Sequence, residues 1–119
     1  MSDEKLVIYH NPRCSKSRQT LEILQQHERN PEIVEYLEHP PEREELKRIL
    51  GMLGISARDL LRKTESIYQD ANLDDDSLND DEIIEAMCEY PALMQRPIVV
   101  QGDRAVIGRP PEKVLELLA

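Results

Sequence analysis

Phenylalanine and tryptophan are absent from this sequence, and its 4 tyrosines are the only aromatic residues. Apolar residues still make up 39% of the 119 residues, which suits one domain with a single core. Because aromatic rings are so scarce, we expect the core to be packed from Leu, Ile, Val and Met side chains.

Long apolar runs and an excess of basic residues are also missing. No run approaches the roughly 20 apolar residues that span a bilayer, and residues 1–5 lack the basic and then apolar form of a signal peptide. The 15 basic and 24 acidic residues give a net charge of −9, whereas nucleic-acid binding needs a basic surface. We therefore expect a cytoplasmic protein that binds neither membranes nor nucleic acid.

Cysteine is scarce, with Cys14 and Cys88 alone. Such a chain is typical of a reducing compartment, so we expect no structural disulfide. The cysteines and histidines do not form a paired-ligand zinc spacing, and we expect no metal. The glycines form no phosphate-binding loop, and Thr20 stands six positions after Cys14, where a phosphatase-type loop needs Arg. Cys88 follows Ile84 by four residues on a helical pattern, which predicts a buried structural residue.

Acidic residues are missing from the whole stretch between Lys5 and Leu21. Within it, Cys14 lies between Arg13 and Lys16, where an apolar strand pattern gives way to a helical one. Nearby cations and a helix N-terminus both favour the thiolate over the thiol. Cys14 is therefore our candidate nucleophile.

The acids are concentrated instead in residues 65–85, which contain no Lys or Arg. They are Glu65, Asp70, Asp74, Asp75, Asp76, Asp80, Asp81, Glu82 and Glu85. We interpret the segment as a solvated acidic face or loop, with a docking surface for a basic partner as the alternative.

Apolar patterning predicts an α/β protein with the order β-α-β, helices, β-β-α. Strands are expected over 6–9, 33–37, 98–101 and 104–107, and helices over 15–28, 42–52, 57–63, 80–89 and from 110 onward. The first two strands should be parallel, and the last two should form a hairpin around Gly102 and Asp103. This makes one domain, 1–119, with a mixed sheet of about four strands flanked by helices and a helical insertion at about 42–93.

This order, with Cys14 at the first strand-to-helix turn and Arg96-Pro97 before the third strand, resembles a thioredoxin fold. The similarity becomes specific in residues 10–18, 36–41, 60–63, 96–100 and 107–110. They resemble the ArsC-type, glutaredoxin-linked arsenate reductase family, nearly from end to end, and in particular its bacterial arsenate-reductase-like branch.

The resemblance implies roles for individual residues. Cys14 would attack arsenate, and Arg62, Arg96 and Arg109 would bind the oxyanion through paired guanidinium hydrogen bonds. His10 would tune the cysteine loop. The supporting loop residues would be Asn11, Ser15, Ser17 and Arg18, and Pro97 is the cis-proline candidate.

The resemblance also implies the reductant. Ser17 stands where a thioredoxin keeps its resolving thiol, so glutathione would attack the adduct on Cys14 and glutaredoxin would remove the glutathione as arsenite forms. Glutathione would be a cosubstrate, with no bound cofactor. The partners would then be glutaredoxin, arsenate and glutathione, acting on a monomer.

Two other functions remain open. The first is a non-catalytic regulator like the Spx branch of this fold, which binds RNA polymerase. Many members of that branch carry a C-x-x-C redox switch, and Ser17 argues against such a switch here. The other is a general glutathione-dependent thiol oxidoreductase, in which the arginines would bind glutathione carboxylates.

Overall fold

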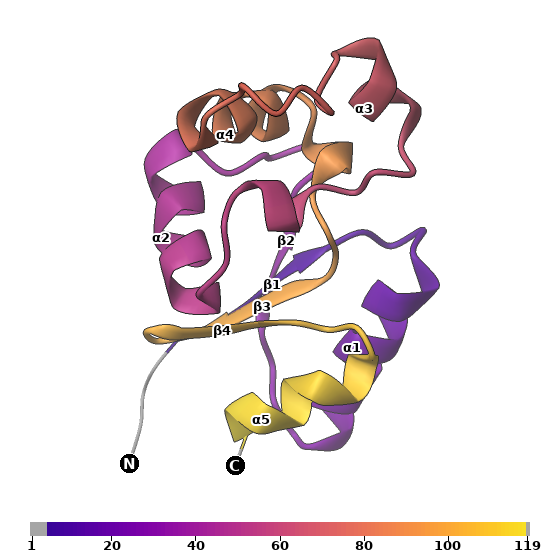
Figure 1. Ribbon diagram of the computed structural model, residues 1–119. Helices are drawn as coiled ribbons and strands as arrows, with labels where there is room; N and C mark the ends of the chain where they lie inside the picture. The colour runs from indigo at the N-terminus through magenta and orange to yellow at the C-terminus, as the bar shows by residue number, and fades with distance from the viewer. Residues whose placement is uncertain (1–4, 119) are drawn as a thin grey trace. The chain divides into compact units, whose positions relative to one another are not determined.

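The computed structural model describes residues 5–118 (Figure 1). The chain divides into two compact units: residues up to 39 together with those from 96 onward, and residues 40–95. The predicted helical insertion at about 42–93 spans nearly the same residues as the second unit. No helix among the described residues is both long and apolar enough to cross a membrane.

The first unit is built on a mixed sheet of four strands in the order β2-β1-β3-β4. The strands are β1 (Leu6–His10), β2 (Glu32–Glu35), β3 (Ile98–Gln101) and β4 (Arg104–Ile107). β1 pairs in parallel with β2 and antiparallel with β3, which pairs antiparallel with β4. The predicted parallel pair, hairpin and four-stranded mixed sheet are confirmed.

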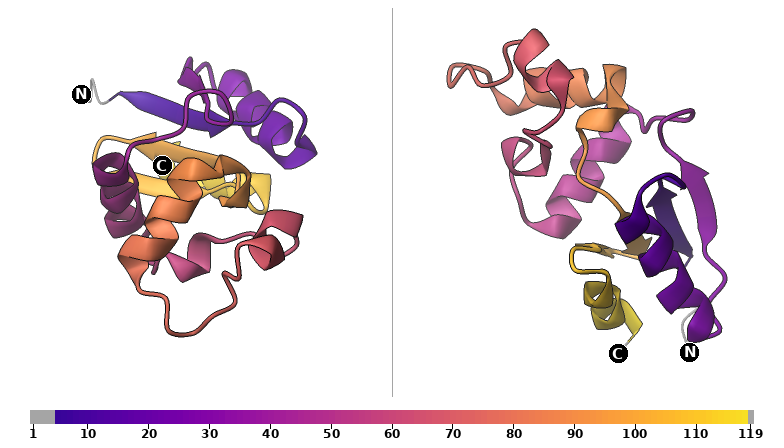
Figure 2. Two further views of the ribbon diagram at one scale, coloured as in Figure 1. Left: turned by 90° about the horizontal axis from the view of Figure 1, so that it is seen from above. Right: turned by 90° about the vertical axis from the view of Figure 1, so that its right-hand side faces the viewer.

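The helices of this unit pack against the sheet through one aliphatic cluster. They are α1 (Ser15–Gln26), the 3₁₀ turn η3 (Pro111–Val114) and α5 (Leu115–Leu118), seen from further sides in Figure 2. Side chains from β1, α1, β3 and the C-terminal helical segment meet there: Leu6, Ile8, Leu24, Val99, Val114 and Leu117. This packing holds the start of α1 beside the end of β1, where the cysteine loop lies.

The second unit is helical. It contains α2 (Arg43–Leu53), η1 (Arg58–Leu60), α3 (Ser66–Asp70), α4 (Asp80–Glu89) and η2 (Pro91–Leu93). α2 ends at Gly54, whose positive φ of 69° suits glycine, and exposed ion pairs connect α2 to α4 from Lys47 to Asp81 and from Arg43 to Glu85. The helices predicted over 42–52 and 80–89 are confirmed.

The second predicted strand, 33–37, is shorter than expected. β2 ends at Glu35, and the chain turns at once through Tyr36, because the N–H groups of Glu38 and His39 both donate to the Glu35 carbonyl. The apolar residue Leu37, which the predicted strand includes, instead follows the strand and is 41% exposed.

The helix predicted over 57–63 is wrong. Only the 3₁₀ turn η1 forms, because Leu61 leaves it with an extended backbone and pairs with Met94. α3 was not predicted, and the C-terminal helix begins at Pro111 with the 3₁₀ turn η3.

The expectation of a purely aliphatic core is also wrong. Tyr9, Tyr36 and Tyr68 are buried, and Tyr90 is exposed. Cys88 is only half-buried, while Met87 and Ile84 take the buried positions beside it.

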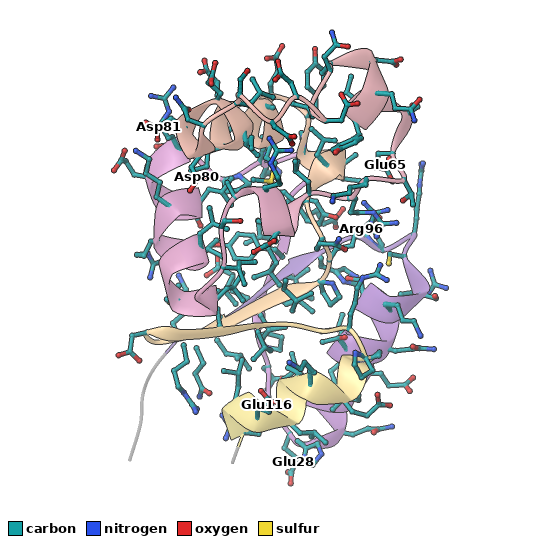
Figure 3. The ribbon with its side chains drawn as sticks, viewed as in Figure 1. Glu28, Glu65, Asp80, Asp81, Arg96 and Glu116 are labelled. Carbon is teal, nitrogen blue, oxygen red and sulfur yellow. The ribbon has the colours of Figure 1, made fainter. Side chains whose placement is uncertain are left out.

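The acidic segment 65–85 is partly helical, since it contains α3 and the beginning of α4. Its acids other than Glu65 are exposed. Asp80 and Asp81, labelled in Figure 3, lie with Glu82 in the first turn of α4, where negative charge is favourable. Asn79 and Glu82 close a capping box, in which each side chain accepts the other's backbone N–H at 2.9 Å.

We expect Asn79→Ala to lower the free energy of unfolding by about 1 kcal/mol, because the N–H of Glu82 loses its acceptor. Glu82→Gln is the matched control, since a glutamine can keep its half of the capping box. Urea unfolding measures both variants. A loss in Asn79→Ala no larger than that in the control would contradict this role.

Candidate active site

Cys14 is the residue at which α1 begins. It is the N-cap, with extended backbone angles of φ −95° and ψ 123°, and the first turn that follows contains no acid. The loop before it is closed by the Cys14 N–H, which donates to the Asn11 carbonyl at 2.9 Å. The thiol therefore lies at the end of a helix where backbone N–H groups have no partner inside the helix.

The surroundings of Cys14 favour the thiolate. Burial raises the pKa of the Cys14 thiol, but the Ser17 N–H, the Arg96 side chain, the Lys16 N–H and the Arg109 charge together hold this pKa below its usual value. The sulfur makes no N-cap hydrogen bond of ordinary geometry, so the N–H groups act at longer range. A larger fraction of the thiol is therefore present as the reactive anion.

Arg96 and Arg109 reach the thiol from the two ends of one hairpin. Arg96 lies two residues before β3, where Figure 3 shows it, and Arg109 lies two residues after β4. Nη2 of Arg109 lies 3.7 Å from the Cys14 sulfur, and its Nε donates to the Arg96 carbonyl at 2.7 Å. Because Ile98 lies opposite Ile107 in the antiparallel pair, these arginines come together although they are far apart in sequence.

Tyr36 supports Arg96 and was missed by the sequence analysis. It is 1% exposed. Burial lowers the pKa of Arg96, but Tyr36 and Cys14 raise it by more, so the guanidinium keeps its charge firmly. The available signal was its position: one of few aromatic residues, directly after an apolar strand.

His10 connects the end of β1 to α1. Its Nδ1 lies 2.6 Å from Oγ of Ser17, which also accepts the Asn11 N–H at 3.1 Å. Burial lowers the pKa of His10, the Glu35 charge raises it and the Arg18 charge lowers it, with a net lowering. The lowered pKa therefore favours the neutral imidazole at pH 7.

The remaining candidates of the supporting loop differ in their contacts and exposure. Nη1 of Arg18 donates to the Pro12 carbonyl at 2.9 Å and braces the loop, whereas Ser15 is exposed at the first position of α1. The Arg13 N–H donates to Oδ1 of Asn11 at 3.0 Å, which adds a second constraint on the loop.

The peptide bond before Pro97, the cis-proline candidate, is cis, and the bond before Pro110 is also cis, which we did not anticipate. Gly108 donates its N–H to the Pro97 carbonyl at 2.9 Å. A Cβ at Gly108 would lie 2.5 Å from Oγ1 of Thr20 and 2.9 Å from Cγ of Pro97. The chain before Arg109 can approach α1 only because this residue is glycine.

Arg62 belongs to the other unit, residues 40–95. There its N–H donates to the Leu93 carbonyl at 2.6 Å, and its Nε lies 3.5 Å from Oε2 of Glu65. Its assignment to the oxyanion site stays a prediction.

The groups assembled at Cys14 are hydrogen-bond donors and cations, which suit a tetrahedral oxyanion. They do not resemble a metal centre, and within residues 5–118 no three His, Cys, Asp or Glu residues are grouped so as to hold a metal ion. A nucleophile beside two guanidinium groups can attack the central atom of an anion that they hold.

Comparison of the sequence with known protein families shows the family of this chain. The ArsC family matches residues 9–117. This chain belongs to the ArsC family.

Similar proteins cover almost the whole chain. The uncharacterized protein YfgD of Escherichia coli K12 is 50% identical over 97% of this chain and 98% of its own length. An arsenate reductase of Haemophilus influenzae is 46% identical over 95% and 98% of the two chains. The solved arsenate reductase of Vibrio cholerae is 47% identical, with a TM-score of 0.93 over 97% and 98%. This likeness includes the thioredoxin-like arrangement of sheet and helices.

We expect Arg96→Gln to raise the pH midpoint of Cys14 alkylation by iodoacetamide by roughly 1 unit, because a cation beside the sulfur is lost. The measurement uses a Cys88→Ser background, so that only Cys14 reacts. Arg13→Gln is the matched control, because Arg13 adjoins Cys14 but is exposed and is not among the groups that lower the thiol's pKa. Equal shifts in the two variants would refute a specific role for Arg96.

We expect Gly108→Ala to lower the free energy of unfolding by roughly 1–3 kcal/mol, because the new Cβ overlaps Thr20 and Pro97. The control is Gly51→Ala in α2, where a Cβ meets nothing within 4 Å. That change should stabilise by about 0.5–1 kcal/mol, since alanine favours a helix. Thermal or urea unfolding measures whether each variant is more or less stable than the parent protein. Equal changes in the free energy of unfolding in the two variants would show that the close contact at Gly108 is unimportant.

Proposed function

We propose that this protein is an arsenate reductase in which Cys14 is the nucleophile. The observation that carries the proposal is the thiol at the start of α1 with the guanidinium group of Arg109 3.7 Å from its sulfur. Relatives named arsenate reductase, 41% and 46% identical over most of the chain, support it.

Arsenate binding is the task of Arg96 and Arg109, with Arg62 as the third arginine. A thiolate and an arsenate anion repel each other, so the cations must neutralise the oxyanion before the sulfur can approach it. Planar guanidinium groups also orient the tetrahedral anion through paired hydrogen bonds, which an ammonium group cannot do. The N–H groups at the start of α1 add to the same binding site.

The first chemical step exchanges an oxygen for sulfur on arsenic. The Cys14 thiolate forms an S–As bond, one As–O bond breaks, and the departing oxygen leaves as water after taking up protons. The arsenic stays pentavalent in this step. The lowered pKa of Cys14 supplies the thiolate without a separate base.

The electrons come from external thiols. Glutathione forms a second S–As bond in place of another oxygen, which leaves as water after taking up protons. A glutaredoxin thiolate then attacks the glutathione sulfur, and the bond between this sulfur and arsenic breaks. The two thiols become a mixed disulfide, and arsenic gains two electrons to become trivalent. Hydrolysis of the remaining S–As bond releases arsenite and restores Cys14. Ser17 in place of a resolving cysteine is the observation that favours this external route.

The test measures arsenite formed from arsenate in the presence of glutathione, glutaredoxin, glutathione reductase and NADPH. We expect Cys14→Ser to reduce arsenite formation to background while the protein remains folded. Cys88→Ser is the matched control, since burial raises the pKa of the Cys88 thiol and keeps it protonated; it should retain activity.

Omitting single components separates the parts of the proposal. Loss of arsenite without glutaredoxin supports the external route, whereas unchanged turnover would refute it. No arsenite above background in the complete mixture would reject arsenate as the substrate. Equal loss in the two serine variants would overturn the assignment of Cys14 as the nucleophile.

A further inference from the structure

A cavity of about 430 Å³ lies beside the cysteine loop and is not used by the reaction described above. Its lining includes His10, Asn11 and Arg13 on the loop side, Glu35 at the end of β2 and Glu38 in the turn that follows. His10 lines this cavity although it is 6% exposed. A buried imidazole therefore connects the cavity to the loop.

Glu35 is held beside this imidazole by the sheet. It lies directly opposite His10 at the end of the parallel β1–β2 pair, so their side chains project from the same face. The Glu35 carbonyl accepts the N–H groups of Glu38 and His39 at 3.0 and 2.9 Å, which fixes its backbone. Glu35 is exposed, but it lines the same cavity as His10, and its charge acts on the ring.

A continuous series of hydrogen bonds leads from the imidazole to Cys14. Nδ1 of His10 lies 2.6 Å from Oγ of Ser17, and this oxygen accepts the Asn11 N–H at 3.1 Å. The Asn11 carbonyl in turn accepts the Cys14 N–H at 2.9 Å. A change at the imidazole is therefore transmitted to the loop that holds the thiol.

The protonation state of His10 decides how Ser17 can bond. When the neutral ring carries its proton on Nε2, the Ser17 hydroxyl donates to Nδ1. When both ring nitrogens are protonated, Nδ1 donates to Ser17, whose oxygen then accepts from both His10 and Asn11. The hydroxyl proton must turn to another acceptor, and the bonds that shape the loop are redistributed.

We propose that Glu35 favours the imidazolium form of His10 and so determines where, as the pH falls below 7, the loop that holds the Cys14 thiol changes its hydrogen bonds. Its carboxylate shifts the balance between the two hydrogen-bonding patterns, and Ser17 and Asn11 pass the change to the loop. Glu35 touches neither the sulfur nor a substrate in this role.

The charged groups around His10 set the pH range. Burial lowers the pKa of His10 most, Glu35 on β2 raises it, and Arg18 on α1 lowers it. Arg13 and Glu38 share the cavity with the ring. Removal of the Glu35 charge takes away the influence that raises the pKa, so the imidazolium form should then appear only at lower pH.

The experiment follows two quantities on the same Cys88→Ser protein: the pH dependence of Cys14 alkylation by iodoacetamide, and the His10 titration by NMR. We expect the alkylation profile to contain, besides the thiol's own titration, a second step at the His10 midpoint. Glu35→Gln should move this second alkylation step and the His10 NMR midpoint to lower pH by about 0.5 unit. The shift is smaller than that expected for a close buried ion pair, because Glu35 is exposed. Glu35→Asp, which keeps the charge, should restore the two pH values. Glu38→Gln should shift them less than Glu35→Gln does.

Ser17→Ala separates the series of hydrogen bonds from a general effect of charge. We expect this variant to keep the His10 titration but lose the second alkylation step. Absence of that step in the parent protein, no shift in Glu35→Gln, or a step that persists in Ser17→Ala would each overturn the proposal. The inference rests on Cys14 being the reactive thiol, as proposed above, but alkylation needs no arsenate, so its failure is distinct from failure of the arsenate reaction.

Discussion

The structure of the site depends on keeping a partly buried sulfur anionic. Burial alone raises the pKa of Cys14, and it is overcome by backbone N–H groups at the start of α1 together with Arg96 and Arg109. The N–H groups are available because the N-cap is a cysteine and the first turn contains no acid. The arginines are available because the β3–β4 hairpin returns the chain to the place where it began. The helix, the hairpin and the loop therefore act together to stabilise the Cys14 thiolate.

Much of the fold could be predicted, because its patterns are local. The apolar run of β1, the amphipathic repeats of α2 and α4, and the turn at Gly102 and Asp103 each depend on residues close in sequence. The wrong helix over 57–63 depends on a distant partner, since Leu61 pairs with Met94. The end of β2 was missed because the turn is made by backbone hydrogen bonds to Glu35, which any residue types can form.

Some residues of the candidate site could be predicted from the sequence, and others could not. Cys14 could be recognised from its neighbours, because a cysteine among cations at a strand-to-helix junction is hard to explain by packing. Arg96 and Arg109 were named by resemblance, since their meeting depends on the register of a hairpin. Tyr36 was missed because its interaction with Arg96 spans 60 positions of the chain and leaves no periodic trace.

The acidic side chains of β2 have a further consequence for the protein in concentrated solution. β2 lies at one edge of the four-stranded sheet, so one side of its backbone has no strand beside it in that sheet. Ile33, 46% exposed, makes this edge attractive for another chain. Glu32, which pairs with Lys5 at 2.6 Å, precedes Ile33, and Glu35 lies two residues after it, so another strand pairing here would have to accommodate charged side chains. Charged side chains on an edge strand disfavour strand exchange and aggregation at that edge.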